Sequence, residues 1–88
     1  MADQLISVGA AVSQRLGETG NPGADDDDVM GTTLNYDTVG MTAFLAKVSD
    51  YIAAAGFTFT YPATFIAAAR LLTVAALIGT IDGMTTNP

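Results

Sequence analysis

Few side chains in this 88-residue sequence could take part in catalysis or hold a metal ion. The chain has no histidine and no cysteine, which removes imidazole bases, thiolate nucleophiles and most metal ligands. Four of its nine acidic residues form a continuous run at 25–28. Contiguous like charges without EF-hand spacing are typical of a solvated loop, and a weak cation site there is the less favoured reading. We therefore expect neither an enzyme nor a metal site.

The charge balance limits the classes of partner. A net charge of -6 repels nucleic acid phosphates and leaves no basic patch for an anionic membrane surface. Asp3 and several polar residues interrupt the first apolar stretch, whereas a secretory signal needs a basic start and an unbroken apolar run. We expect a cytoplasmic protein that does not bind nucleic acid.

The segment at 62–81 is long and apolar enough to raise the question of a membrane span. Its single charge, Arg70, lies near the middle, where insertion into a bilayer costs about 2.5 to 3.5 kcal/mol. The segment is also rich in alanine and threonine rather than in leucine and phenylalanine. We favour two short soluble helices here, and a membrane-associated or virion protein stays open as an alternative.

Helical periodicity predicts two long helices separated by a long loop. Apolar residues recur at three- and four-residue intervals over 2–16 and again over 41–55. On the first helix these are Leu5, Val8, Val12 and Leu16. Thr42 is the expected cap of the second helix. Between the helices, about 17–39, glycine, proline and aspartate predict an exposed loop.

The C-terminal third predicts a short helix and a final helix. The sequence FTFTY alternates like a strand, but a lone strand has no partner for its backbone, so we expect an extended loop there. A short helix is expected over 63–69, and Thr73 is placed to cap a last helix. The tail at 84–88 is expected to fray. The sequence thus predicts one all-α domain over 1–88, a small bundle of three main helices and one short helix.

Five residues at the start of the second predicted helix, GMTAF at 40–44, form a motif. With the chain length and helix order, it resembles the acyl carrier protein family, which includes carrier domains of polyketide and nonribosomal peptide synthases. That family opens its second helix with G-x-D-S-L, whose serine receives phosphopantetheine. The resemblance matches the motif in order to Gly40, Met41, Thr42, Ala43 and Phe44. A Thr73-Val74 pair fits the place where the family often opens its last helix.

The resemblance implies a carrier that cannot be loaded as written. Ala43 occupies the serine position, and its methyl group has no oxygen with which to form the phosphodiester. Phosphopantetheine would be expected only if position 43 is natively serine. An engineered serine-to-alanine change and a natural serine-less docking or scaffolding module both remain open.

The resemblance also implies a partner surface on the second helix. The positions expected to face outward beside Ala43 are Ala46, Lys47, Asp50 and Ala54. Partners would be biosynthetic enzymes such as ketosynthase, acyltransferase or condensation domains, with a phosphopantetheinyl transferase added if position 43 is natively serine. Fatty acid, polyketide and peptide pathways all stay open.

Overall fold

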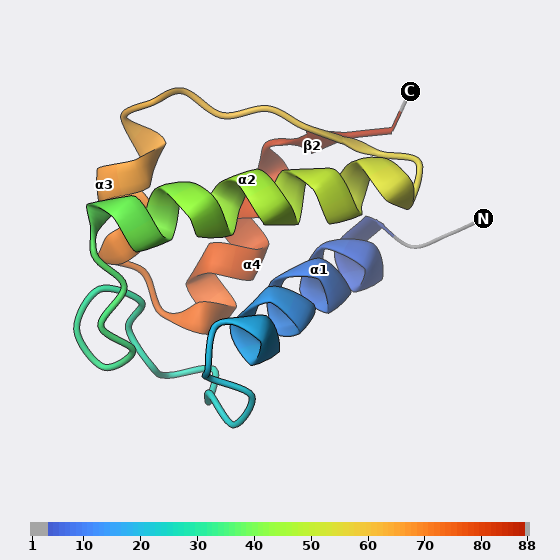
Figure 1. Cartoon of the computed structure of the whole chain (residues 1–88). Helices are drawn as coiled ribbons and strands as arrows, with labels where there is room; N and C mark the ends of the chain where they lie inside the picture. Colours follow the sequence, from blue (N-terminus) through green and yellow to red (C-terminus); the bar gives the residue numbers. More distant parts are fainter. Residues whose placement is uncertain (1–3, 88) are drawn as a thin grey trace.

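Four helices and a two-stranded sheet make up the chain over residues 4–87, the part described by the computed structural model (Figure 1). The elements are α1 (Gln4–Glu18), α2 (Thr38–Ala54), β1 (Thr58–Phe59), α3 (Phe65–Arg70), α4 (Val74–Gly83) and β2 (Thr85–Thr86). The prediction of four helices, one of them short, is confirmed. The small sheet departs from the predicted all-α class.

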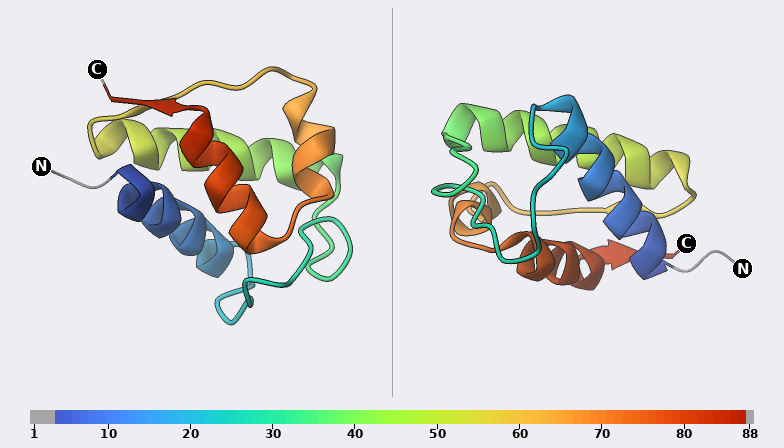
Figure 2. Two further views of the ribbon diagram at one scale, coloured as in Figure 1. Left: turned by 180° about the vertical axis from the view of Figure 1, so that it is seen from behind. Right: turned by 90° about the horizontal axis from the view of Figure 1, so that it is seen from below.

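The helices enclose one apolar core. α2 packs against α1 and α3, and α4 packs against α1 behind α2 (Figures 1 and 2). Side chains from three helices are completely buried between them: Val8, Val12, Phe44, Leu45, Val48, Ile52, Leu77 and Ile81. Removing these side chains from water is the main force that holds the helices together.

The N-terminal turn of α1 contacts the C-terminal segment through a polar side chain. Gln4 Nε2 donates to the main-chain oxygens of Asp82 and Thr85, at 2.9 Å each. Leu5, predicted to lie on the buried face, is instead half exposed, whereas Val8 and the later apolar positions of the helix are buried as predicted. The first turn of α1 is therefore positioned by hydrogen bonds rather than by apolar packing.

The C-terminal segment forms a strand, which corrects two predictions. Thr58 pairs with Thr86 and Phe59 with Thr85 in antiparallel register. The segment FTFTY is therefore not an unpartnered loop. The predicted frayed tail at 84–88 is wrong for 85–86, and Pro88 lies outside the described residues. Thr85 is buried, and its hydroxyl donates to the carbonyl of Ile81 at 2.7 Å.

α2 begins earlier than predicted because a different residue caps it. Asp37 Oδ1 accepts the backbone N–H of Gly40 at 2.6 Å, so the helix starts at Thr38. The predicted cap, Thr42, lies inside the helix, where its hydroxyl donates to the carbonyl of Thr38 at 2.7 Å. At α4 the predicted cap is confirmed, since Thr73 Oγ1 accepts the N–H of Ala76.

The loop over 19–37 is fixed to the start of α4. The carbonyls of Asp28 and Asp26 accept the N–H groups of Val74 at 2.9 Å and Ala75 at 3.1 Å, which would otherwise be unpaired at a helix start. The aspartate run therefore lies at the positive end of the α4 dipole, which favours negative charge. Among residues 4–87 no cluster of metal-ligating side chains is present.

The segment at 62–81 is divided between α3 and α4, with a turn between the two helices. Within the described part of the chain, no helix combines the length and the apolar character that crossing a bilayer requires.

Candidate functional site

The residues of the predicted motif lie on two opposite faces of α2. Thr42 and Ala43 are exposed, whereas Met41 and Phe44 are completely buried. Gly40 is partly exposed in the first turn, next to the Asp37 cap. The motif therefore divides into an anchor inside the core and a pair of small side chains presented to solvent.

The position of this motif along α2 differs from the position that the carrier resemblance implies. In that arrangement the motif opens the helix, but here α2 begins at Thr38 and Ala43 falls in its second turn. The backbone N–H groups left free at a helix start are those of its first turn, so position 43 does not lie among them. The methyl group of Ala43 also provides no oxygen to which phosphopantetheine could be attached at this position.

The buried half of the motif fixes the orientation of α2. The Phe44 ring meets the Tyr36 ring edge to face, with centroids 5.2 Å apart. Met41 and Phe44 both have 0% exposure. Because these side chains set the rotation of the helix, the opposite face must point to solvent.

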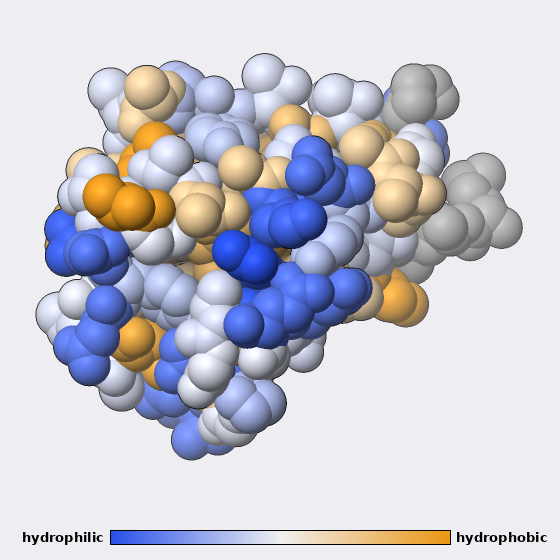
Figure 3. Space-filling view, viewed as in Figure 1, coloured by the Kyte–Doolittle hydropathy of each residue, from blue (hydrophilic) through white to orange (hydrophobic). Residues whose placement is uncertain are grey.

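The exposed face of α2 carries the positions expected to bind partners. These are Ala43, Ala46, Lys47, Asp50 and Ala54, all exposed. Figure 3 shows pale apolar surface along α2, interrupted by hydrophilic side chains, with a stronger apolar patch over the start of the helix. The Lys47 ammonium lies 5.9 Å from the centre of the Tyr51 ring. No pocket is found among residues 4–87.

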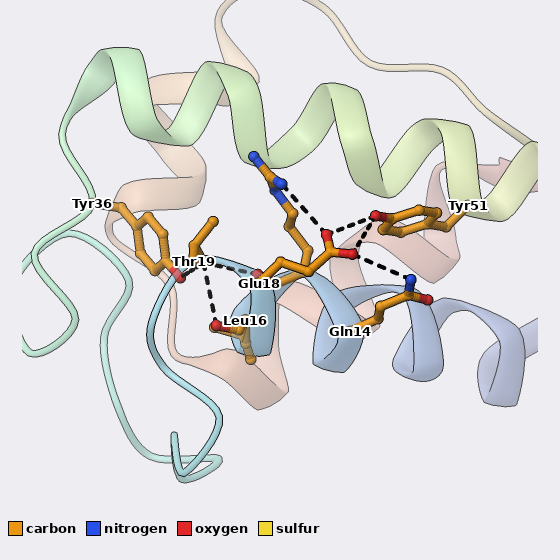
Figure 4. Close-up of polar contacts among 7 residues, drawn as sticks. Gln14, Leu16, Glu18, Thr19, Tyr36 and Tyr51 are labelled. Carbon is orange, nitrogen blue, oxygen red and sulfur yellow. Dashed lines mark hydrogen bonds and ion pairs between the residues drawn. The ribbon is translucent and has the colours of Figure 1, made fainter.

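A polar cluster joins the end of α1 to α2 (Figure 4). The Tyr51 hydroxyl lies 2.6 Å and 2.7 Å from the two carboxylate oxygens of Glu18, to which it donates. Gln14 and Arg15 also contact this carboxylate, Arg15 at 3.4 Å. The hydrogen bond from Tyr51 lowers the pKa of Glu18, and the same bond raises the pKa of Tyr51. Sequence reasoning missed this cluster because its two halves lie 33 residues apart.

The Glu18–Tyr51 bond predicts a pH dependence of stability. A lowered pKa means that the contribution of Glu18 is complete above its ordinary pKa of 4.5 and is lost as the pH falls through the folded-state value. A raised pKa means that the contribution of Tyr51 is complete below 10.0 and is lost as the pH rises through its folded-state value. Tyr51→Phe should remove the effect of Tyr51 and the largest part of the effect of Glu18, whose pKa is still lowered by Gln14 and Arg15.

Urea unfolding of the parent and Tyr51→Phe from about pH 3 to about pH 11 tests this prediction. The difference in unfolding free energy should be largest near neutral pH and shrink toward both ends. Tyr61→Phe is the matched control, because it also removes a tyrosine hydroxyl, from a ring that stacks on Phe59. A constant difference across the pH range would contradict the prediction.

A second polar cluster fixes the segment that enters α2. The Tyr36 hydroxyl contacts the Thr19 hydroxyl (Figure 4). It also accepts a hydrogen bond from Asn21 Nδ2 at 3.0 Å. The backbone oxygen of Tyr36 accepts a hydrogen bond from Arg70 Nε at 2.9 Å. Tyr36 thus joins three parts of the fold: the end of α1, the start of α2 and the end of α3.

Three kinds of comparison relate the chain to known proteins. No family model, curated protein or solved structure matches it. The resemblance to carrier proteins therefore depends on the order of the helices and on residues 40–44 and 73–74 alone. The functional interpretation is built on the geometry of this chain.

Proposed function

We propose that this chain is a non-catalytic binding module with a bundle of the acyl carrier type. It docks on cytoplasmic biosynthetic enzymes through the exposed face of α2. Ketosynthase, acyltransferase and condensation domains of fatty acid, polyketide or peptide pathways are the partner classes that the carrier resemblance implies. Because position 43 is alanine, binding rather than cargo transport is the function of the chain as written.

One observation carries this proposal: the side chain at position 43 is presented on the surface while its neighbours anchor the helix. Ala43 is exposed on α2, and Met41 and Phe44 on either side of it are completely buried. A partner can therefore contact position 43 without disturbing the core. The order of the elements, a long helix, a long loop, a long helix, a short helix and a last helix, supports the carrier-type fold.

Restoring the hydroxyl tests the carrier part of the proposal. Ala43→Ser and the unchanged chain are incubated in parallel with coenzyme A and a broad-specificity phosphopantetheinyl transferase, and the products are weighed by mass spectrometry. We expect Ala43→Ser to gain one phosphopantetheine arm and the unchanged chain to gain none, because only the variant offers an oxygen at the motif position. An exposed alanine-to-serine change in a helix costs only about 0.5 kcal/mol, so the variant should fold.

Ala46→Ser is the matched control, because Ala46 is also exposed and lies about one turn further along α2. It should remain unmodified, since a transferase recognises the position of the hydroxyl and not only its presence. Modification of neither variant, with both folded, would remove the carrier-type assignment. Modification of both would show that the reaction does not recognise position 43.

A further inference from the structure

The methionines of the described residues differ in their access to solvent. Met30 and Met41 have 0% exposure, whereas Met84 is only partly buried and packs against the core. The chain has no cysteine and no tryptophan, so its thioethers are the groups most readily oxidised by a hydroperoxide. Of these three thioethers, only that of Met84 belongs to a residue that solvent reaches in the folded molecule.

Met84 lies where the start of α1, the end of α4 and the small sheet meet (Figures 1 and 2). Gln4 Nε2 donates to the main-chain oxygens of Asp82 and Thr85, which come before and after Met84, at 2.9 Å each. The carbonyl of Met84 itself accepts the N–H of Thr60 at 3.4 Å, beside the pairing of β1 with β2. We call these three hydrogen bonds and the β1–β2 pairing the Gln4 clasp.

The Gln4 clasp is a weak unit compared with the helical core. β1 and β2 are each two residues long, and a two-stranded sheet is marginally stable at best by itself. A typical hydrogen bond adds only about 0.5 to 1.5 kcal/mol to stability. Segments of this kind open locally at a lower free energy than the core unfolds. A modest loss of apolar packing at Met84 is therefore enough to shift the clasp toward an open form.

We infer that Met84 is a redox-sensitive position whose oxidation to the sulfoxide opens the Gln4 clasp while the helical core stays folded. A sulfur lone pair attacks one oxygen of a hydroperoxide, the S–O bond forms, and the O–O bond breaks. The sulfur loses two electrons, the proton of the attacked oxygen passes to the departing oxygen, and the peroxide leaves as an alcohol or water. The sulfoxide is polar, so it disrupts apolar packing, and a sulfoxide reductase with a thiol as reductant reverses the step. This inference goes beyond the proposed binding role and does not depend on it.

Limited oxidation with hydrogen peroxide, followed by trypsin digestion and mass spectrometry, tests which methionine reacts. Trypsin cuts after the basic residues and gives the peptides 1–15, 16–47, 48–70 and 71–88. Met84 lies in the last peptide, whereas Met30 and Met41 both lie in the second. We expect the last peptide to gain one oxygen atom at least about tenfold faster than the second, because the buried thioethers react only when the core opens. Equal rates in a chain that keeps its helical circular dichroism would overturn the inference.

NMR of the isotope-labelled chain before and after oxidation shows whether the clasp opens. The amide of Thr60, which bonds to the Met84 carbonyl, should exchange with solvent about tenfold faster, while the amides within α2 keep their rates. The side-chain amide signal of Gln4 should move to the position of a solvated glutamine. Gln14, the other glutamine of the chain, bonds to Glu18 instead and should not move.

Met84→Leu is the matched control, because leucine keeps an apolar side chain at this position and has no sulfur to oxidise. After the same peroxide treatment, this variant should keep slow exchange at Thr60 and an unmoved Gln4 signal. An equal change in the treated variant would assign the effect to another methionine and overturn the inference. Unchanged exchange at Thr60 in a chain fully oxidised at Met84 would also overturn it. Reduction of the sulfoxide should restore the original exchange rate, and a change that persists after reduction would exclude a reversible switch.

Discussion

Replacing Gly31 with alanine is expected to lower the free energy of unfolding by about 3 kcal/mol, at the upper end of the usual range for overpacking. A Cβ at this position would lie 2.7 Å from the carbonyl oxygen of Arg70 and 2.9 Å from its Cβ. The nearest obstacle is backbone, which cannot rotate away as a flexible side chain can. Relief of the clash must also weaken the Gly31–Arg70 hydrogen bond of 2.8 Å, one of those that fix the loop to the end of α3.

Urea unfolding monitored by circular dichroism measures this effect. A loss of 3 kcal/mol is large for an 88-residue domain, whose total stability is roughly 4 to 13 kcal/mol. Gly23→Ala is the matched control in the same loop, because a Cβ there meets nothing within 4 Å. We expect Gly23→Ala to change the unfolding free energy by less than about 0.5 kcal/mol. Equal midpoints for the two variants would show that the loop does not need the close approach at Gly31.

Features of the fold that depend on nearby residues were predictable from the sequence. The apolar periodicity of α1 and α2 lies within each helix, and Thr73 caps α4 only three residues from its partner, Ala76. The start of α2 was misplaced because two competent caps lie close together. Asp37 rather than Thr42 caps the helix, because Asp37 precedes the apolar face by a full turn and its cap adds the first turn to the helix.

Features that depend on distant partners were not predictable. β1 needed β2, which lies at the other end of the following two helices. The sequence predicts only a solvated loop for the aspartate run, because no neighbouring residue indicates that the carbonyls of Asp26 and Asp28 pair with the start of α4. In each case a backbone group that seemed unpaired in sequence finds its partner only after the helices have packed.

The candidate site also has features that could be predicted from nearby residues and features that could not. The outward direction of Ala43, Ala46 and Lys47 follows from the rotation of about 100° per residue in a helix, once Met41 and Phe44 are assigned to the core. Leu71 had no such signal, since it read as one more apolar residue of a long apolar segment. The Arg70–Tyr36 hydrogen bond, which spans 34 positions, holds the end of α3, next to Leu71, against the segment that enters α2.

Truncation of Phe44 to alanine is expected to have the largest effect on stability, a loss of about 3 to 5 kcal/mol. Phe44 is completely buried, and its ring packs edge to face with Tyr36 at 5.2 Å. The cavity left by the ring would lie at the junction of α2 with the loop that fixes it. Tyr36 would lose its aromatic partner while still bonded to Asn21 and Arg70, so the surroundings are poorly placed to collapse into the space.

Phe44→Leu separates the structural role of this residue from the role that the carrier motif assigns to it. Leucine is the motif residue, so it should support modification of an Ala43→Ser background if the carrier assignment is right. Its smaller side chain should lower the unfolding free energy by only about 1 to 2 kcal/mol. Ala43→Ser alone should lower it by about 0.5 kcal/mol, because position 43 is exposed. Urea unfolding should therefore give Phe44→Ala the lowest unfolding free energy, Phe44→Leu a higher one and Ala43→Ser the highest of the three. A loss of unfolding free energy at position 43 as large as that at position 44 would contradict the division of the motif into a buried anchor and an exposed face.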